Sequence, residues 1–182
     1  MESQLILNEG RQADGRDLLE ARKMTFRKMN NAFLFNLDDN QYFFISFHYC
    51  SRTNQDRRDK IVIRPNIHIL NQIVRTADND SLKEYLVIDI SGHEEISMMH
   101  LVDAVIIVLK DLEIHLKYAF EAFSFKIIQD SKNTKFVLDS DIESQKEAIL
   151  VKAGRSDLFL MEAFGEIEAE LLKEIVQSCF DS

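Results

Sequence analysis

The sequence predicts an α+β fold: a single domain with a mixed five- to six-stranded sheet, two β-hairpins, one βαβ unit and a C-terminal pair of helices. Three observations predict it. Two stretches each contain a pair of aromatic or β-branched runs around a short polar turn. A strand, a helix and a second strand follow one another between residues 60 and 90. The C-terminal part carries two amphipathic helical patterns.

The clearest local signal is the first hairpin. The runs Ala32–Leu37 and Gln41–Cys50 flank residues 38–40, Asp-Asp-Asn, a turn sequence typical of hairpins. The second run alternates, and we expect its more apolar odd positions to face the core. The second hairpin is predicted at residues 124–129 and Thr134–Leu138.

The βαβ unit is predicted between the hairpins. Residues 60–64 form a strand that ends at Pro65, and Asn66 is expected to cap the helix that follows. Residues 85–90 are a continuous β-type run, which is typical of an interior strand. Two strands joined by a helix at this spacing favour a right-handed crossover.

Four further helices are expected from capping residues and apolar periodicity. Residues 1–13 are interpreted as a flexible lead-in and residues 14–182 as the single domain. The expected helices cover residues 14–29 after Asp14, residues 97–123 after Ser97, residues 140–154 after a capping box, and residues 157–180 after Ser156.

Composition argues against several functions. The 182 residues carry a net charge of −9, and 10 basic against 22 acidic residues lie in residues 76–182. A negative field opposes binding to polyanions and to anionic membranes, so we expect no nucleic-acid and no membrane partner. Two distant cysteines and the lack of glycine-rich phosphate or dinucleotide motifs predict no cofactor and no metal. Reduced thiols favour a cytoplasmic location.

One basic stretch departs from this balance. Its aromatic neighbours are Tyr42, Phe44 and Tyr49, an association that single-strand binders use. Asp56 and Asp59 dilute the charge, so we interpret the stretch as a charged loop beside core aromatics. The basic residues are Arg52, Arg57, Arg58, Lys60 and Arg64.

A polar cluster follows the predicted interior strand: Asp89, His93, Glu94, Glu95 and His100. Ligands bind beyond the carboxyl ends of strands in α/β sheets, and these side chains could supply metal ligands or an acid–base pair. The alternative function is therefore a small metal- or acid/base-dependent enzyme. The competing interpretation is a solvated loop in which Asp89 accepts hydrogen bonds from loop amides.

Residues 85–105 resemble the strand–loop–helix of STAS domains, the anti-sigma-antagonist type. The resemblance lies in Tyr-Leu-Val-Ile-Asp-Ile-Ser-Gly at residues 85–92, then Ile96 and Leu-Val-Asp-Ala-Val at residues 101–105. Met98 and Met99 stand where that family carries its phosphorylatable serine. The resemblance implies a regulatory, protein-binding switch without that serine.

The last predicted helix carries more apolar surface than one core stripe needs. Leu158, Met161 and Leu172 lie off the main stripe, and Glu162 belongs to the acidic face opposite it. We expect these residues to bind a partner, unless they pack on the preceding helix. The sequence thus favours a non-enzymatic cytoplasmic protein-binding module, an adaptor, chaperone-like, immunity or regulatory protein. Its partner would be another protein or a second copy in a homodimer.

Overall fold

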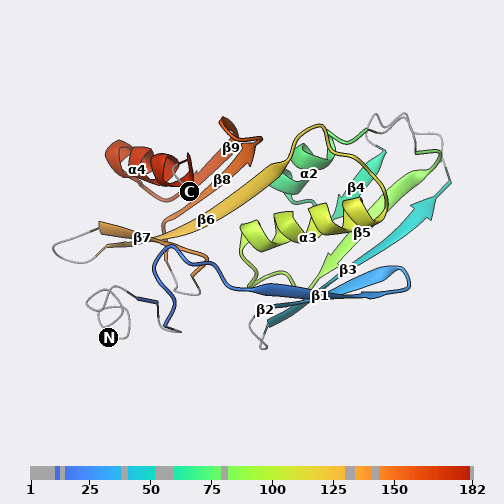
Figure 1. Cartoon of the computed structure of the whole chain (residues 1–182), viewed down its shortest axis with the longest axis horizontal. Coiled ribbons are helices and arrows are strands. Elements are labelled where there is room, and N and C mark those ends of the chain that lie inside the picture. Colours follow the sequence, from blue (N-terminus) through green and yellow to red (C-terminus); the bar gives the residue numbers. More distant parts are fainter. Residues whose placement is uncertain are drawn as a thin grey trace. The chain divides into compact units, whose positions relative to one another are not determined.

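The structure is a computed structural model that describes residues 11–12, 15–37, 41–51, 60–78, 82–129, 134–140 and 144–180. Within these residues the chain forms nine strands and three helices (Figure 1). It divides into two compact units. The central unit comprises Lys23–Ile96 and His100–Phe120, and the terminal unit comprises Met1–Arg22, Ser97–Met99 and Glu121–Ser182.

The central unit contains a mixed five-stranded sheet in the order β1-β2-β3-β5-β4. The first three strands form an antiparallel meander, β5 is antiparallel to β3, and β4 is parallel to β5. The strands are β1 Met24–Met29, β2 Ala32–Leu37, β3 Gln41–Cys50, β4 Ile61–Arg64 and β5 Tyr85–Ser91, and the helices are α2 His68–Val74 and α3 Met98–Asp111.

Alternation along the strands produces the core of this unit. Phe43, Ile45 and Phe47 of β3 are buried, whereas the even positions between them are exposed. Helices α2 and α3 lie on the apolar face of the sheet (Figure 1). Lys28 of β1 forms an ion pair of 2.6 Å with Asp111 at the end of α3. The predicted first hairpin and its inward-facing odd positions are confirmed up to Phe47.

The βαβ unit is also confirmed. Strand β5 lies between β3 and β4, and its residues Leu86, Ile88 and Ile90 are buried, as an interior strand requires. The helix between the parallel strands begins at His68, and Ile67 occupies the N-cap position without a side-chain hydrogen bond. Asn66 is therefore not the cap that the sequence predicted.

The terminal unit contains a four-stranded sheet in the order β7-β6-β8-β9 and one helix, α4. β6 pairs with β7, and β8 pairs with β9, both antiparallel. The first of these pairs is the predicted second hairpin. The elements are β6 Phe120–Gln129, β7 Thr134–Leu138, β8 Glu147–Ala153, β9 Asp157–Phe164 and α4 Ala169–Phe180.

Lys152 of β8 connects this sheet to α4 through its side chain. The Lys152 side chain is 7% exposed, and its Nζ donates a hydrogen bond of 2.7 Å to the carbonyl oxygen of Cys179 in the last turn. The ammonium group also lies 3.3 Å from Glu121 and over the rings of Phe123 and Phe180. A cation at the carbonyl end of a helix is favourable, and here it is also shielded from water.

Asp139 organises the N-terminal segment of the terminal unit. Its carboxylate is fully buried and accepts hydrogen bonds from the Arg22 side chain at 2.8 and 3.1 Å, from the Arg22 backbone at 2.7 Å, and from Ser97 at 2.8 Å. Arg16 approaches the same carboxylate at 3.5 Å. Gln12 donates to the neighbouring carbonyl of Leu138 at 3.1 Å.

Several sequence-based predictions are corrected. The strands form two sheets rather than one sheet of five or six strands. The helix expected at residues 14–29 is absent over its described part, where β1 occupies Met24–Met29 and Gly15 has a positive φ of 88°. A helix interior cannot contain that backbone conformation. The long helix expected to reach residue 123 ends at Asp111, because the chain then turns toward β6.

The predicted C-terminal pair of helices is also wrong. Residues 147–153 and 157–164 form the β8/β9 hairpin, and only Ala169–Phe180 are helical. The predicted capping residues 141–143 lie outside the described residues, as does most of the predicted lead-in and all of the first hairpin turn. The mixed α+β class is nevertheless correct.

Candidate functional site

The face of the central sheet opposite α2 and α3, here called the outer face, carries exposed aromatic side chains. Tyr42 and Phe44 of β3 are 50% and 44% exposed. They alternate with the buried residues Phe43 and Ile45, so they point away from the core. Two exposed aromatic rings on one strand leave apolar surface in contact with water, which is thermodynamically unfavourable.

The strand register adds a cation to this surface. Arg27 of β1 lies opposite Leu34 of β2, and Leu34 lies opposite Phe44 of β3. Residues directly opposite in antiparallel strands share a face, so these three side chains form one row across the sheet. Arg27 is exposed and Leu34 is half-buried.

A second row carries charges of both signs. Arg64 of β4 lies opposite Asp89 of β5, which in turn lies opposite Ser46 of β3. The Nδ1 atom of His48 lies 3.4 Å from Oδ2 of Asp89. Arg64 and His48 thus flank the single carboxylate in this row, and both are exposed to solvent.

These rows match the chemistry of a single strand of nucleic acid. An exposed aromatic ring can stack on a base of any sequence, and arginine pairs with phosphate or stacks on a base. Histidine and serine can donate hydrogen bonds to phosphate oxygens. The outer face combines these groups on one rigid sheet, which fixes their spacing.

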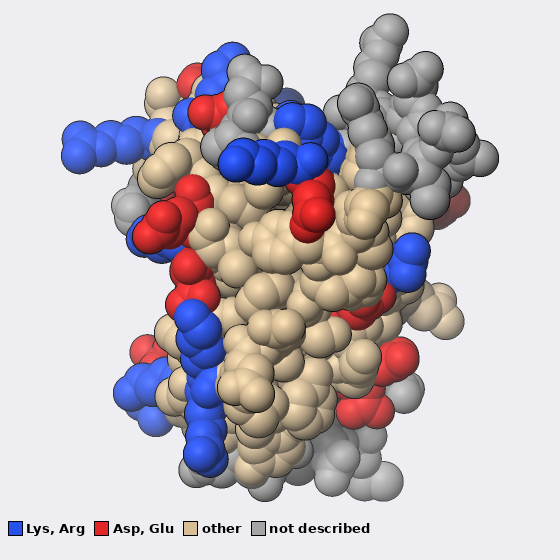
Figure 2. Space-filling model, turned by 90° about the vertical axis from the view of Figure 1, so that its right-hand side faces the viewer, with Lys and Arg blue, Asp and Glu red and all other residues tan. Residues whose placement is uncertain are grey.

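On the face that Figure 2 shows, charged side chains border an area of uncharged surface. Figure 2 shows the right-hand side of Figure 1, where the ends of several central-unit strands lie. A central area of uncharged side chains is bordered by basic groups at its top and along one side, with acidic groups interspersed. No extended basic surface crosses this area, so electrostatic attraction for a polyanion must be local here.

The structure separates the polar cluster predicted after the interior strand. Asp89 points to the outer face, because its neighbours Ile88 and Ile90 are buried on the other face. His100 belongs to α3 and is 2% exposed. Among the described residues, no group of three or more His, Cys, Asp or Glu side chains could hold a metal ion.

The remaining members of that cluster lie in the loop between β5 and α3. Glu94 and Glu95 are exposed at a turn in which the backbone carbonyl of His93 accepts a hydrogen bond from Ile96 at 3.0 Å. The Nδ1 atom of His93 is buried and has no hydrogen-bond partner within the described part of the chain. The loop begins at Gly92, which has a φ of 72°, and a Cβ at this position would lie 3.2 Å from the backbone carbonyl oxygen of Tyr42.

The predicted partner-binding residues belong to two elements of the terminal unit. Leu158 and Met161 are 42% and 43% exposed, but they lie on strand β9 rather than on a helix. Glu162 is half-buried on the same strand. Leu172 is half-buried on α4.

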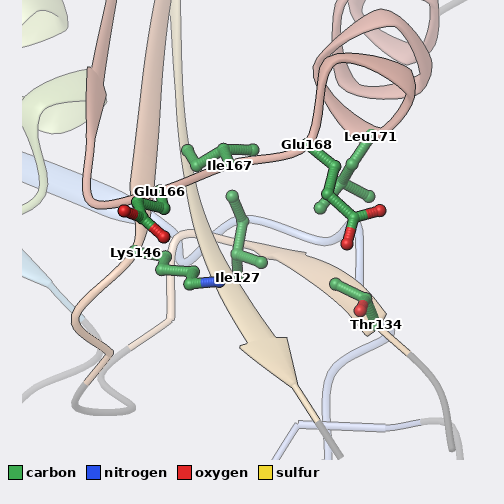
Figure 3. A pocket seen from close by; sticks show the side chains of 7 residues that line it. All are labelled: Ile127, Thr134, Lys146, Glu166, Ile167, Glu168 and Leu171. Atoms are coloured by element: carbon green, nitrogen blue, oxygen red, sulfur yellow. The ribbon is translucent and has the colours of Figure 1, made fainter.

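A small pocket in the terminal unit does not provide a substrate site. It has a volume of about 10 Å³, which is room for a single water molecule. Figure 3 shows its lining, with the Lys146 side chain beneath Ile167 and the Glu168 carboxylate directed toward Thr134. The other lining residues are Ile127, Glu166 and Leu171.

Sequence reasoning missed Arg27 because residues 14–29 were predicted to form a helix, whereas Arg27 lies on strand β1. The signal that could have found it is the Asn30-Asn31 pair between two strand-like runs, since a two-residue asparagine turn is typical of tight hairpins. That turn forms the β1/β2 hairpin, in which Met29 lies opposite Ala32. Tyr42 and Phe44 were assigned to the correct strand but were interpreted as core aromatics, whereas both side chains are exposed.

No protein-family model matches this chain, and no curated protein matches it in sequence. Its fold is nevertheless similar to solved structures of exosome proteins. The rice (Oryza sativa) protein Rrp46 aligns with 91% of this chain and 91% of its own, at 14% identity and a TM-score of 0.69. The Archaeoglobus fulgidus exosome with RNA bound to its active site covers 96% of this chain and 90% of its own, at 14% identity and a TM-score of 0.65. An archaeal exosome core covers 96% and 88%, at 12% identity and a TM-score of 0.63.

These similarities correct the functional predictions. The expectation of a protein-binding adaptor or regulatory module is contradicted, because 91–96% of the chain aligns with the fold of exosome proteins. The STAS resemblance covered only a local strand–loop–helix that this larger fold also contains. The expectation of no nucleic-acid partner is wrong for the same reason, since one of the similar structures holds RNA.

No helix among the described residues is long and apolar enough to cross a membrane.

Proposed function

We propose that this chain is an RNA-binding subunit of a multi-subunit RNA-processing assembly, and that the outer face of its central sheet contacts single-stranded RNA. One observation carries the proposal: more than nine-tenths of the chain shares the fold of exosome structures, one of which holds RNA. Cys50 and Cys179, both in the described part of the chain, form no disulfide, which supports the cytoplasmic location expected from the sequence.

The outer face supports a single strand rather than a duplex as the ligand. Tyr42 and Phe44 are half exposed on one strand, and only unpaired bases offer their faces to such rings. Arg27 and Arg64 lie in the rows beside them and can neutralise phosphates. Stacking therefore supplies the larger share of the affinity, and charge supplies the smaller share.

The net charge of −9 limits how strong this binding can be. An overall negative field slows the approach of a polyanion and opposes contacts outside the outer face. An RNA contact of this kind is best suited to a subunit that shares its ligand with neighbouring subunits. Several modest contacts on one strand then add up through effective concentration.

The proposal is tested by titrating the protein into a fluorescein-labelled single-stranded oligouridine and following anisotropy. We expect the double variant Tyr42→Ala/Phe44→Ala to bind at least tenfold more weakly, because each stacked base contributes about 1–3 kcal/mol. Arg27→Ala should make the negative slope of log K against log salt less steep by about 0.7, which corresponds to the loss of one phosphate contact. Tyr118→Ala is the matched control, since Tyr118 is 40% exposed but lies outside the sheet.

Two results would contradict the proposal. If the wild-type chain binds neither oligouridine nor oligoadenosine at low salt, the RNA-binding function is wrong. If RNA binds but Tyr42→Ala/Phe44→Ala and Tyr118→Ala weaken it equally, the outer face is not the site. Far-UV circular dichroism of each variant establishes that the sheet is intact.

A further inference from the structure

Strand β9 forms one edge of the terminal-unit sheet. It pairs with β8 on one side only, since the order is β7-β6-β8-β9. A bulge between Val151 and Lys152 disturbs the pairing near the start of β9, and regular register extends from Leu160 to Phe164. Five regular residues at an edge present backbone groups in the spacing that another strand can pair with.

The side chains on this edge are unusually apolar for an exposed strand. Leu158, Met161 and Phe164 are 42%, 43% and 50% exposed. Met161 lies opposite Leu150 and Phe164 lies opposite Glu147, so the two side chains are on opposite faces of the sheet. A strand added at this edge would therefore cover apolar side chains on both faces of the sheet.

Natural edge strands usually carry features that prevent such pairing. Lysine, proline and inward-pointing charges are the common ones. The segment Asp157–Phe164 contains neither lysine nor proline, and its only internal charge is Glu162. The bulge disturbs the strand before Leu160 and leaves the last five residues regular. The unprotected part of β9 is thus suited to pairing with another chain.

The charge around the edge indicates which chain would pair. Residues 157–180 contain six acidic residues and one lysine, and that lysine, Lys173, lies 3.9 Å from Glu170. A second copy of β9 would bring Asp157 and Glu162 close to the same carboxylates, and like charges across an interface are costly. A strand that bears lysine or arginine would meet opposite charge instead.

We infer that the edge of β9 is a subunit interface that binds, by strand addition, an extended basic segment of a different protein chain. Backbone hydrogen bonds supply affinity, and the exposed side chains of Met161 and Phe164 favour apolar side chains on the added strand. The inference depends on the proposed function in one respect, because it assigns a surface to the assembly in which the chain is proposed to act.

The experiment uses the full chain and two synthetic eight-residue peptides, one alternating valine with lysine and one alternating valine with glutamate. Fluorescence anisotropy measures binding, and hydrogen–deuterium exchange locates it. We expect the lysine peptide to bind at least tenfold more tightly and to protect the amides of residues 160–164. Met161→Lys should weaken binding about tenfold, whereas Leu19→Lys should change it less than twofold. Leu19 is 54% exposed, lies outside β9 and receives the same charge.

Other outcomes would overturn the inference. They are equal binding of both peptides, equal weakening by the two lysine variants, and protection elsewhere than in β9. A wild-type dimer that Met161→Lys dissociates would show that a second copy occupies the edge. Oligouridine binding is measured in parallel: intact RNA binding without peptide binding refutes only this interface, and peptide binding without RNA binding refutes only the proposed function.

Discussion

Asp139 shows how one buried charge determines local structure. Its carboxylate is fully buried, and the Arg22 side chain that binds it is only 4% exposed. Burying this pair is costly, but removing one member leaves the other charge without compensation in a medium of low dielectric. The φ of 48° at Asp139 adds backbone strain that the hydrogen bonds must offset.

We therefore predict that Asp139→Asn lowers the free energy of unfolding by about 3–5 kcal/mol. The substitution preserves the shape of the side chain and removes the charge that both arginines face. Urea titration followed by far-UV circular dichroism measures the loss. Asp157→Asn is the control, because Asp157 is exposed and should change stability by less than about 0.5 kcal/mol. A loss below about 1 kcal/mol at Asp139 would mean that the arginines find other partners.

Cys179 provides a pH-dependent prediction at the same scale. Burial raises the pKa of its thiol to about 11, because the thiolate would be desolvated. In the unfolded chain the pKa is near 9, so between pH 9 and 11 the unfolded state releases a proton that the folded state retains. The contribution of Cys179 to stability is therefore present below pH 9 and lost as the pH rises toward 11.

Urea titrations at pH 8, 9, 10 and 11 on the wild type and Cys179→Ala test this prediction. The wild type should lose more stability across the range than the variant, since alanine has no proton to release. Other groups titrate at these pH values, so the difference between the two proteins is the quantity of interest. Parallel curves for the two proteins would exclude a buried, neutral thiol.

At the scale of elements, two glycines lie in the turns on either side of β9, and Gly165 lies inside the helix predicted at residues 157–180. Gly154 has a φ of 74° in the turn between β8 and β9, and Gly165 has a φ of 77° between β9 and α4. Gly165 also lies close to the backbone of the segment before β8, because a Cβ at Gly165 would come within 2.6 Å of the Gln145 carbonyl oxygen. Only glycine can occupy this position without a shift of the backbone.

We predict that Gly165→Ala costs more stability than Gly154→Ala. Both substitutions place alanine at a positive φ, which costs about 1 kcal/mol. Gly165→Ala adds the clash with Gln145, whereas a Cβ at Gly154 meets nothing within 4 Å. The difference in urea midpoints, at equal m-values, isolates the clash. Equal costs at the two glycines would show that residues 144–146 move aside easily.

Strands β3 and β9 show where reasoning from the sequence succeeds and where it fails. The period-2 pattern of Gln41–Cys50 fixed both the strand and its buried face, because alternation and tertiary packing agree there. Residues 157–164 contain leucine, methionine, glutamate and alanine, which all favour helix, and Leu160, Phe164 and Ile167 happen to follow helical spacing. Pairing with β8 overrides this preference, and no local pattern reports that pairing.

The candidate site was predictable only in part for a related reason. Tyr42 and Phe44 were associated with a basic stretch from sequence, and the structure places them on an exposed face. Arg27 reaches the same face from β1, through a register that connects residues 17 positions apart. Side chains that meet across strands cannot be identified from the spacing of either strand alone.

At the scale of the whole molecule, the chain passes between the two compact units four times. The chain passes from one unit to the other after Arg22, Ile96, Met99 and Phe120. Helix α3 begins in the terminal unit with Met98 and continues in the central unit. Neither unit is a continuous stretch of sequence, because a segment of each is inserted between segments of the other.

We predict that the two units unfold in one transition, as the single domain expected for residues 14–182 requires. All four tyrosines lie in the central unit, and the chain has no tryptophan, so tyrosine emission reports on that unit alone. In a Cys50→Ser background, labelling of the Cys179 thiol reports on the terminal unit. The two urea midpoints should coincide within about 0.2 M, because two-state unfolding gives the same midpoint for every probe. An earlier exposure of Cys179, with tyrosine emission unchanged, would show that the terminal unit unfolds independently and that the chain contains two domains.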